Sequence, residues 1–409
     1  MSYLRNVTHV AKRYAMVRYF AGAVVARVGD EMSGPALLLA GYTVAGSASE
    51  ASALLAGITV AAAAGGPVLG AVLDRRQRPG RLLAVALVLY ATGLAVILTG
   101  LGRLPFGVTM LIAVLTGLLG PALSGGWTGQ LPRVAAGDRL PRANALDAMT
   151  FGMASLSGPV LAGGLAEALG TSAAVVVSAG LIGSAAPAAW TLPARGTRVP
   201  RARPGALLGD LAAGARVVVG NPRLARATLA SVVCCAAQGM LTACVPLLGE
   251  RVLGGAGRGA LLLSCTAVSA LAANAVLARF PQGIAPDPVI WAGALIQAGA
   301  FALAATGRPA TLVLALLLAG AGEGPQLTAL FAVRHREAPD RLRGQIFTTG
   351  ASLKITAFAA GAAIAGPLAT WSLPGTLATA AGVAACAAPA FFAVPLRAGE
   401  PAEASPRPE

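Results

Sequence analysis

Long apolar stretches separated by short polar ones run through the whole chain. Twelve stretches of about 20 or more largely apolar residues occur at 14–42, 50–73, 82–102, 105–129, 144–168, 172–194, 224–248, 259–279, 286–306, 309–333, 345–371 and 373–396. Each is long enough to cross a hydrocarbon core of about 30 Å as an α-helix. The pattern therefore predicts an all-α integral membrane protein with twelve transmembrane helices.

Basic residues occupy alternate gaps between these stretches. With a cytoplasmic N-terminus, 25 of the 31 Lys and Arg residues fall in segments on the cytoplasmic side, four fall outside, and Arg27 and Lys354 fall within helices. Because positively charged loops stay in the cytoplasm, both termini are predicted to be cytoplasmic. Arg far outnumbers Lys, and Ala and Gly are abundant, which favours a bacterial cytoplasmic (inner) membrane as the location of this multi-pass chain.

Composition agrees with a membrane protein. Hydrophobic residues make up 56% of the chain and charged residues only 11%, and the mean hydropathy is +0.72. Soluble domains carry about 25% charged residues. The net charge of +15 is spread over short loops, so we expect no nucleic-acid partner. The expected partners are the lipid bilayer and a small-molecule substrate, with the protein a monomer.

The longest polar interval, 195–223, separates six predicted helices from six. We therefore expect a six-helix bundle over 1–194, a cytoplasmic linker over 195–223, a second bundle over 224–396 and a disordered cytoplasmic tail over 397–409. Apolar residues at helical spacing between Leu207 and Val219 predict a short linker helix. It either lies on the membrane interface or packs on the bundle.

The two predicted bundles share short motifs at corresponding places. Asp138-Arg139-Leu140 recurs as Asp340-Arg341-Leu342, and Gly158-Pro159 recurs as Gly366-Pro367. A third motif, 70–75, has a weaker counterpart at 274–279. Three matches in the same order predict two pseudo-symmetric halves that arose by duplication.

The loop after the second helix contains Gly70, Asp74, Arg75 and Arg78 in the sequence GAVLDRRQRPGR. It resembles the G-x-L-A-D-R-x-G-R-[RK] signature of the major facilitator superfamily, although positions 77 and 79 differ. Over its full length the chain resembles this superfamily. The resemblance implies the major facilitator fold of two six-helix bundles and a transport function.

Gly70 and Asp74 also have a physical interpretation. A residue without a side chain lets a neighbouring helix approach closely, and a carboxylate at a helix end can meet the positive N-terminus of another helix. The resemblance implies that this other helix is the eleventh, beginning near Gly344 and Gln345, and that the contact closes the cytoplasmic side. The alternative is that the loop charges only determine topology.

Gly158, Pro159 and Gly163 in the fifth helix are similar to the G-x-x-x-G-P-x-x-G-G element of proton-coupled exporters in the superfamily, with Ala154 in place of the first glycine. The alternative is an ordinary proline kink among small residues. Many drug/proton antiporters carry an arginine midway along the fourth helix, but 105–129 has no charge. This absence and the loop that follows resemble the branch of the enterobactin exporter and macrolide efflux proteins.

Five charges lie inside predicted helices: Arg27, Asp30, Glu31, Glu323 and Lys354. A charge at a helix centre costs about 2.5–3.5 kcal/mol on insertion scales, so such residues face a cavity or a partner. Arg27 precedes Asp30 by three residues and Glu31 by four. These spacings place the arginine beside either carboxylate, so the set is expected to neutralise itself within the first helix.

Glu323 is predicted near the bilayer midplane, between glycines and Pro325, where an irregular backbone against a cavity is expected. Lys354 is predicted at similar depth in the next helix and close enough to meet it. We favour Asp30 and Glu323 as proton carriers and keep Glu31 as a third candidate. The alternative is that all five charges form a structural ion-pair set. Asp147, Glu167 and Asp287 are expected near helix ends, where they affect topology.

The sequence favours a secondary active transporter that exports a small amphiphilic molecule, such as a drug, antibiotic, metabolite or siderophore, in exchange for protons. The expected energy source is the proton gradient. No catalytic residue, metal site or cofactor is expected. ATP-driven transport is not expected either, because the glycine-rich runs lack a phosphate-loop Lys-Ser or Lys-Thr. Proton-coupled uptake is the alternative, and a membrane-embedded enzyme or a transport-like receptor is a more remote one.

Overall fold

The computed structural model describes residues 2–44, 48–196, 207–254, 259–280 and 285–395. Within these ranges the chain is helical and contains no β-strand. The α-helices are α1 (Ser2–Val44), α2 (Ala48–Asp74), α3 (Pro79–Gly100), α4 (Phe106–Gly117), α5 (Gly125–Thr128), α6 (Leu140–Leu169), α7 (Thr171–Ser184), α8 (Ala186–Trp190), α9 (Leu207–Gly220), α10 (Pro222–Leu253), α11 (Gly259–Arg279), α12 (Pro286–Ala304), α13 (Pro309–Glu337), α14 (Arg343–Trp371) and α15 (Leu373–Ala393). Short 3-10 turns cover Gly120–Ala122, Leu131–Arg133 and Gly137–Arg139.

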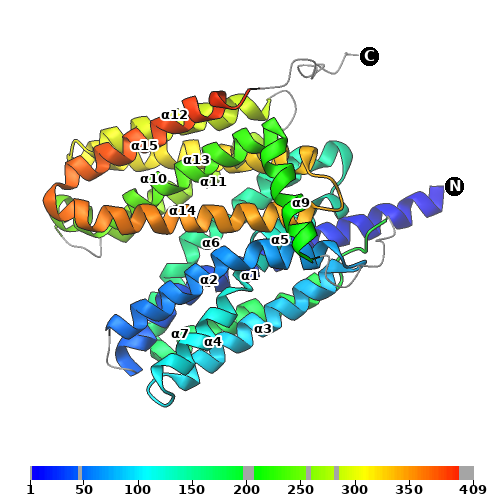
Figure 1. Ribbon diagram of the computed structural model, residues 1–409, viewed down its shortest axis with the longest axis horizontal. Coiled ribbons are helices and arrows are strands. Elements are labelled where there is room, and N and C mark those ends of the chain that lie inside the picture. Colours follow the sequence, from blue (N-terminus) through cyan, green and yellow to red (C-terminus); the bar gives the residue numbers. More distant parts are fainter. Residues whose placement is uncertain (1, 45–47, 197–206, 255–258, 281–284, 396–409) are drawn as a thin grey trace.

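The helices form two groups, α1 to α8 and α10 to α15, which meet near α9 and diverge toward the opposite end (Figure 1). In the first group α1 packs on α6 and α7. In the second, α10 packs on α14 and α15, and α13 packs on α11 and α12. The groups touch mainly through α2 with α14 and α6 with α11.

Eleven segments of the described chain are long and apolar enough to cross a membrane. The helix α1, which carries Arg27, Asp30 and Glu31, is not among them. The predicted membrane segment over 105–129 is found as one span, Phe106–Arg133. It is not one continuous helix, because α4 ends at Gly117 and gives way to a 3-10 turn and the short α5. Pro121 lacks an N–H, and glycines in this stretch weaken the helix.

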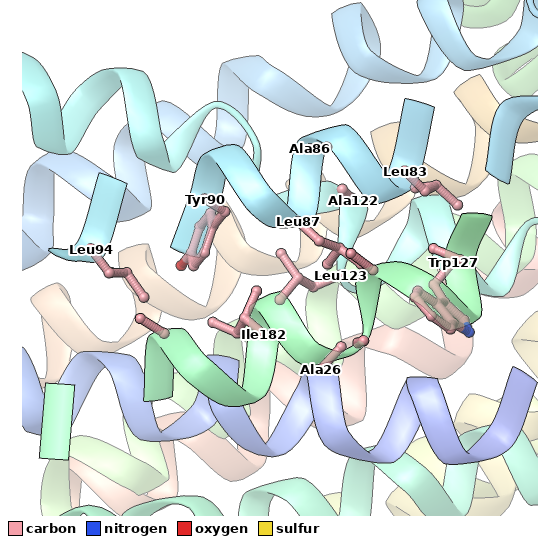
Figure 2. Packing of buried hydrophobic residues seen from close by; sticks show 14 of the residues in the cluster. Ala26, Leu83, Ala86, Leu87, Tyr90, Leu94, Ala122, Leu123, Trp127 and Ile182 are labelled. Atoms are coloured by element: carbon pink, nitrogen blue, oxygen red, sulfur yellow. The ribbon is translucent and has the colours of Figure 1, made fainter. Parts of the chain in front are cut away.

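The first group has an apolar core built from four helices and a 3-10 turn. Trp127 of α5, Leu87 of α3 and Ile182 of α7 are fully buried there, as is Leu123, which follows the 3-10 turn Gly120–Ala122; Ala26 of α1 lies beneath them (Figure 2). The alanine lets α1 pass close to the larger side chains of its neighbours. This packing fixes the position of α1, which carries several intramembrane charges.

The helix α9 occupies the predicted linker and packs on the bundle. Arg75 at the end of α2 forms an ion pair with Asp210 of α9, with Nε and Oδ2 2.7 Å apart. Gln345 of α14 donates from Nε2 to the carbonyl oxygen of Leu211 at 3.1 Å. The helix therefore packs on the bundle, as one of the two alternatives predicts. The middle of the linker, 197–206, and the predicted tail from residue 397 onward lie outside the described residues.

The backbone around Glu323 is a regular helix, so the prediction of irregular backbone there is wrong. The helix α13 continues through Pro325 from Pro309 to Glu337. Gly320 and Gly324 instead allow close packing of α11, since an added Cβ would lie 2.0 Å from the Thr266 carbonyl oxygen and 2.6 Å from that of Ala270, respectively. These glycines serve helix packing.

Candidate functional site

A cavity between the two helix groups contains most of the intramembrane charges. Its first lobe, about 440 Å³, is lined by Asp30 and Tyr90 among others, and its second lobe, about 540 Å³, is lined by Glu323 and Gln297 among others. The lobes share six lining residues: Glu31, Thr59, Phe151, Leu327, Lys354 and Ile355. They are therefore two parts of one cavity lined by both halves of the chain.

The three predicted proton carriers all line this cavity. Asp30 accepts a hydrogen bond from the Tyr90 hydroxyl at 3.1 Å. Glu31 is exposed to the cavity and borders both lobes. Glu323 borders the second lobe. Within the described ranges none of the three forms an ion pair, so each carboxylate is open to a proton or a ligand.

Glu323 of α13 and Lys354 of α14 lie on successive helices and both line the second lobe. They do not form an ion pair in the described structure. Glu323 and Lys354 therefore share one lobe of the cavity, as expected, but do not contact each other directly.

Arg27 is not paired with Asp30 or Glu31, so the expected self-neutralised set in α1 is wrong. Its Nη1 lies 3.0 Å from Oδ1 of Asp147 in α6, and the two side chains are 3% and 0% exposed. The guanidinium also bonds to the hydroxyls of Thr128 and Thr150. Because Asp147 satisfies Arg27, the two α1 carboxylates are left without a basic partner.

Asp147 was expected at a helix end, but it is fully buried. Besides Arg27, it accepts hydrogen bonds from the hydroxyls of Tyr19 at 3.0 Å and Thr128 at 2.8 Å. The partners come from α1, α5 and α6. Only the packing of these helices brings them together, so spacing within one helix could not identify the pair.

Arg334 is a cavity residue that the sequence analysis missed. It was counted among the cytoplasmic loop charges, yet it belongs to α13, is 2% exposed and lines the first lobe. The adjacent His335 is also buried, against Phe347. Helical spacing could have found Arg334, because Glu323 precedes it by 11 residues, about three turns.

Three aromatic rings connect the two halves across the cavity. Phe151 of α6 lies 5.9 Å from Phe331 of α13, which lies 6.0 Å from Phe347 of α14, as measured between ring centroids. The Arg27 guanidinium lies 3.7 Å from the Phe151 centroid, and that of Arg334 lies 5.8 Å from the Phe347 centroid. An apolar row with an arginine at each end therefore crosses the interface.

The end of the bundle where α2 meets α14 is closed; we call it the sealed end. Asp74 accepts hydrogen bonds from the backbone N–H groups of Gly344 at 2.9 Å and Gln345 at 2.8 Å, at the start of α14. Arg195 forms an ion pair with the same carboxylate. Asp74 thus joins the first half to the positive N-terminus of a helix in the second half.

Gly70 lies in the same contact. A Cβ added there would come within 2.4 Å of the Gln345 Cα, so only glycine permits this approach. Arg75 pairs with Asp210 of the linker helix, whereas Arg78 is exposed before α3. The structure therefore brings Gly70, Asp74 and Arg75 into the sealed end, and Arg78 stays at its surface.

The helix-5 element is only partly in contact with the site. A Cβ on Gly158 would lie 2.5 Å from the Cβ of Glu31, so α6 packs closely against α1 at this residue. Pro159 lines the second lobe. Gly163 is exposed and has nothing within 4 Å of an added Cβ. Gly158 and Pro159 thus belong to the cavity wall, whereas Gly163 does not.

The Arg27–Asp147 pair generates a stability prediction. Asp147→Asn leaves a buried arginine without its carboxylate, which typically costs about 3–5 kcal/mol. We expect the thermal unfolding midpoint of the purified protein in detergent to fall by several degrees. The double variant Arg27→Gln, Asp147→Asn should recover most of the loss, and Asp138→Asn, at an exposed residue, should have no effect. A double variant as unstable as Asp147→Asn would contradict the pairing.

Comparisons with known proteins agree with this architecture. An uncharacterised MFS-type transporter, y4rN, of Sinorhizobium fredii (strain NBRC 101917 / NGR234) is 29% identical over 289 residues, which cover 69% of this chain and 71% of that protein. The structure of the human organic anion transporter MFSD10 (TETRAN) superposes with a TM-score of 0.75 and 17% identity, covering 93% of this chain and 99% of that one.

Two further solved structures share the fold. A bacterial homologue of the iron transporter ferroportin, in an outward-facing state, gives a TM-score of 0.73 with 15% identity over 93% of this chain and 98% of that one. The proton:xylose symporter XylE, bound to 6-bromo-6-deoxy-D-glucose, gives 0.71 with 15% identity over 93% and 96%. The family pattern of the Major Facilitator Superfamily matches residues 19–347. The chain belongs to the Major Facilitator Superfamily, and it is a multi-pass membrane transporter and not an enzyme.

Proposed function

We propose that this transporter exports a small amphiphilic molecule in exchange for protons by alternating access. The observation that carries the proposal is the set of three carboxylates, Asp30, Glu31 and Glu323, that line one cavity between the halves without forming an ion pair in the described structure. Intramembrane carboxylates are costly and mark ion or substrate pathways. The proton gradient is the proposed energy source.

The sealed end is proposed to face the cytoplasm. Helix ends and loops on this side carry Arg75, Arg76, Arg78, Arg133, Arg139, Arg195, Arg341 and Arg343. Because positive loops remain on the cytoplasmic side, the cavity would then be closed to the cytoplasm in this state. The ferroportin homologue is also named as outward-facing. We place the protein in a bacterial cytoplasmic membrane, in line with its Sinorhizobium relative.

Export is the favoured direction because of the contact between α6 and α1. Gly158, in the element that resembles proton-coupled exporters, lies against Glu31. The element that resembles proton-coupled exporters therefore borders a carboxylate of the cavity. In an exchanger, proton and substrate alternate at such a group, so the position of Glu31 beside this element suits the mechanism.

Proton-coupled uptake is the second candidate. XylE, named as a proton:xylose symporter, and the fucose transporter FucP, with a TM-score of 0.69, have the same fold as this chain. At 15% and 16% identity this likeness concerns the fold alone. Protein reconstituted in vesicles distinguishes the two modes. In exchange, protons leave the vesicle as substrate enters, whereas in symport protons and substrate enter together.

The contact at the sealed end generates the next prediction. Asp74→Asn removes the negative charge at the N-terminus of α14 and the ion pair with Arg195, so the sealed end should open more often. In protein without its native cysteines, a cysteine at the fully buried Thr348 should react several-fold faster with N-ethylmaleimide after Asp74→Asn. Asp138→Asn is the control. An unchanged rate in both variants would show that Asp74 is not part of a gate.

The carboxylates generate a prediction about coupling. A drug panel in a pump-deficient host first identifies a transported compound, and proton movement on its addition is then measured in proteoliposomes. Glu323→Gln should abolish proton flux and leave substrate exchange intact, because a neutral side chain cannot carry the proton. Asp287→Asn, at a residue outside both lobes, is the control. Undiminished flux in Glu323→Gln, Asp30→Asn and Glu31→Gln alike would refute coupling through these groups.

A further inference from the structure

The first lobe of the cavity holds charges of both signs that have no ion-pair partner in the described chain. Arg334 lies on the second half, and Asp30 and Glu31 lie on the first. Neither Nε nor Nη2 of Arg334 has a hydrogen-bond partner. A buried cation without a counter-charge is costly, so a site of this kind is expected to gain a partner from outside.

The surroundings of Arg334 hold the guanidinium in place. A Cβ added to Gly350 of α14 would lie 2.2 Å from its Nη2, so the glycine makes room for it. The guanidinium lies 5.8 Å from the centroid of the Phe347 ring, and its Nε and Nη2 have no hydrogen-bond partner. A planar guanidinium with free N–H groups matches the two oxygens of a carboxylate or the oxygens of a phosphate.

The opposite side of the lobe suits a cation. Asp30 and Glu31 are adjacent in α1 and both line the lobe, and no described basic residue forms an ion pair with either. Arg27, one turn away, is already satisfied by Asp147. Phe151 lines the lobe as well and is partly exposed, and the buried rings of Phe331 and Phe347 continue the apolar row behind it.

We propose that the transported molecule is a zwitterionic amphiphile, whose anionic group binds Arg334 and whose cationic group binds the Asp30 and Glu31 carboxylates over the aromatic row. This substrate class rests on the proposed exchange of substrate for protons. A cationic group on Asp30 and Glu31 occupies the carboxylates that would otherwise hold a proton. Substrate and proton therefore exclude one another, as exchange requires.

Norfloxacin is a suitable probe, because it carries a carboxylate and a piperazine ammonium at opposite ends of an aromatic body. Its methyl ester lacks the negative charge, its N-acetyl derivative lacks the positive charge, and the acetylated ester lacks both. Binding of each to the purified full-length protein in detergent is measured by calorimetry. We expect norfloxacin to bind about tenfold or more tightly than either singly charged derivative, because each loses a charge-assisted contact.

Variants assign each charge to its side chain. Arg334→Gln should weaken norfloxacin binding to the level of the ester and leave binding of the ester unchanged. Glu31→Gln should reduce the preference for norfloxacin over its N-acetyl derivative. Arg341→Gln, at an exposed arginine, is the control. Without ligand, Arg334→Gln should also raise the thermal unfolding midpoint, because it removes an uncompensated buried charge.

Gly350→Ala provides a second variant if Arg334→Gln does not fold. Its methyl group would displace the guanidinium, so norfloxacin should bind more weakly, whereas Gly366→Ala in the same helix, with nothing within 4 Å, should not change binding.

The proposal is wrong if norfloxacin does not bind, if its ester binds equally well, or if both Arg334→Gln and Gly350→Ala retain full preference for norfloxacin. Equilibrium binding does not require proton flux, so failure of this proposal is distinguishable from failure of proton-coupled export.

Discussion

The structure depends on the rule that a charge inside the membrane must meet a partner or a polar cavity. Arg27 and Asp147 satisfy it by pairing across α1 and α6, both almost fully buried. Asp74 satisfies it at the N-terminus of α14. Charges without an ion pair in the described chain, such as Glu31 and Arg334, occur where the cavity lies. The cavity is thus where these charges can bind an oppositely charged group from outside the protein.

The same rule explains why the halves can separate. The contact at the sealed end depends on a few directional bonds to Asp74 and on glycines such as Gly70 that permit close approach. Glycine-mediated packing of one backbone on another needs little side-chain interlocking, so such a contact can form and break. The Arg27–Asp147 pair, by contrast, lies within one half and holds α1 against α6. Rigid halves joined by a contact that can form and break are what alternating access requires.

Much of this fold could be predicted from the sequence. Apolar length and the position of arginines identify the membrane segments, and the motif around Asp74 led to the contact near Gly344 and Gln345 that the structure contains. These features are local, or they follow a family pattern. The break after Gly117 was missed, since a 25-residue apolar run looks continuous even when Pro121 interrupts it.

The pairing of charges could not be predicted, because it depends on how helices distant in sequence pack. Arg27 has nearby carboxylates in its own helix, yet its partner lies 120 residues away. Arg334 was assigned to a loop because it falls one residue beyond an apolar run. Only the structure shows it buried between Phe347 and Gly350. Which charges pair and which face the cavity therefore depends on tertiary contacts, although each charged residue could be identified from the sequence.

Alternation of the two ends is tested most directly by paired distance measurements. Spin labels at 76 and 341 report on the sealed end, and labels at 42 and 371 report on the opposite end; all four residues are exposed. Between pH 8 and pH 5 in nanodiscs, we predict a second population in which the distance between 76 and 341 increases while that between 42 and 371 decreases. Distances that stay fixed, or that change in the same direction at both ends, would contradict alternating access.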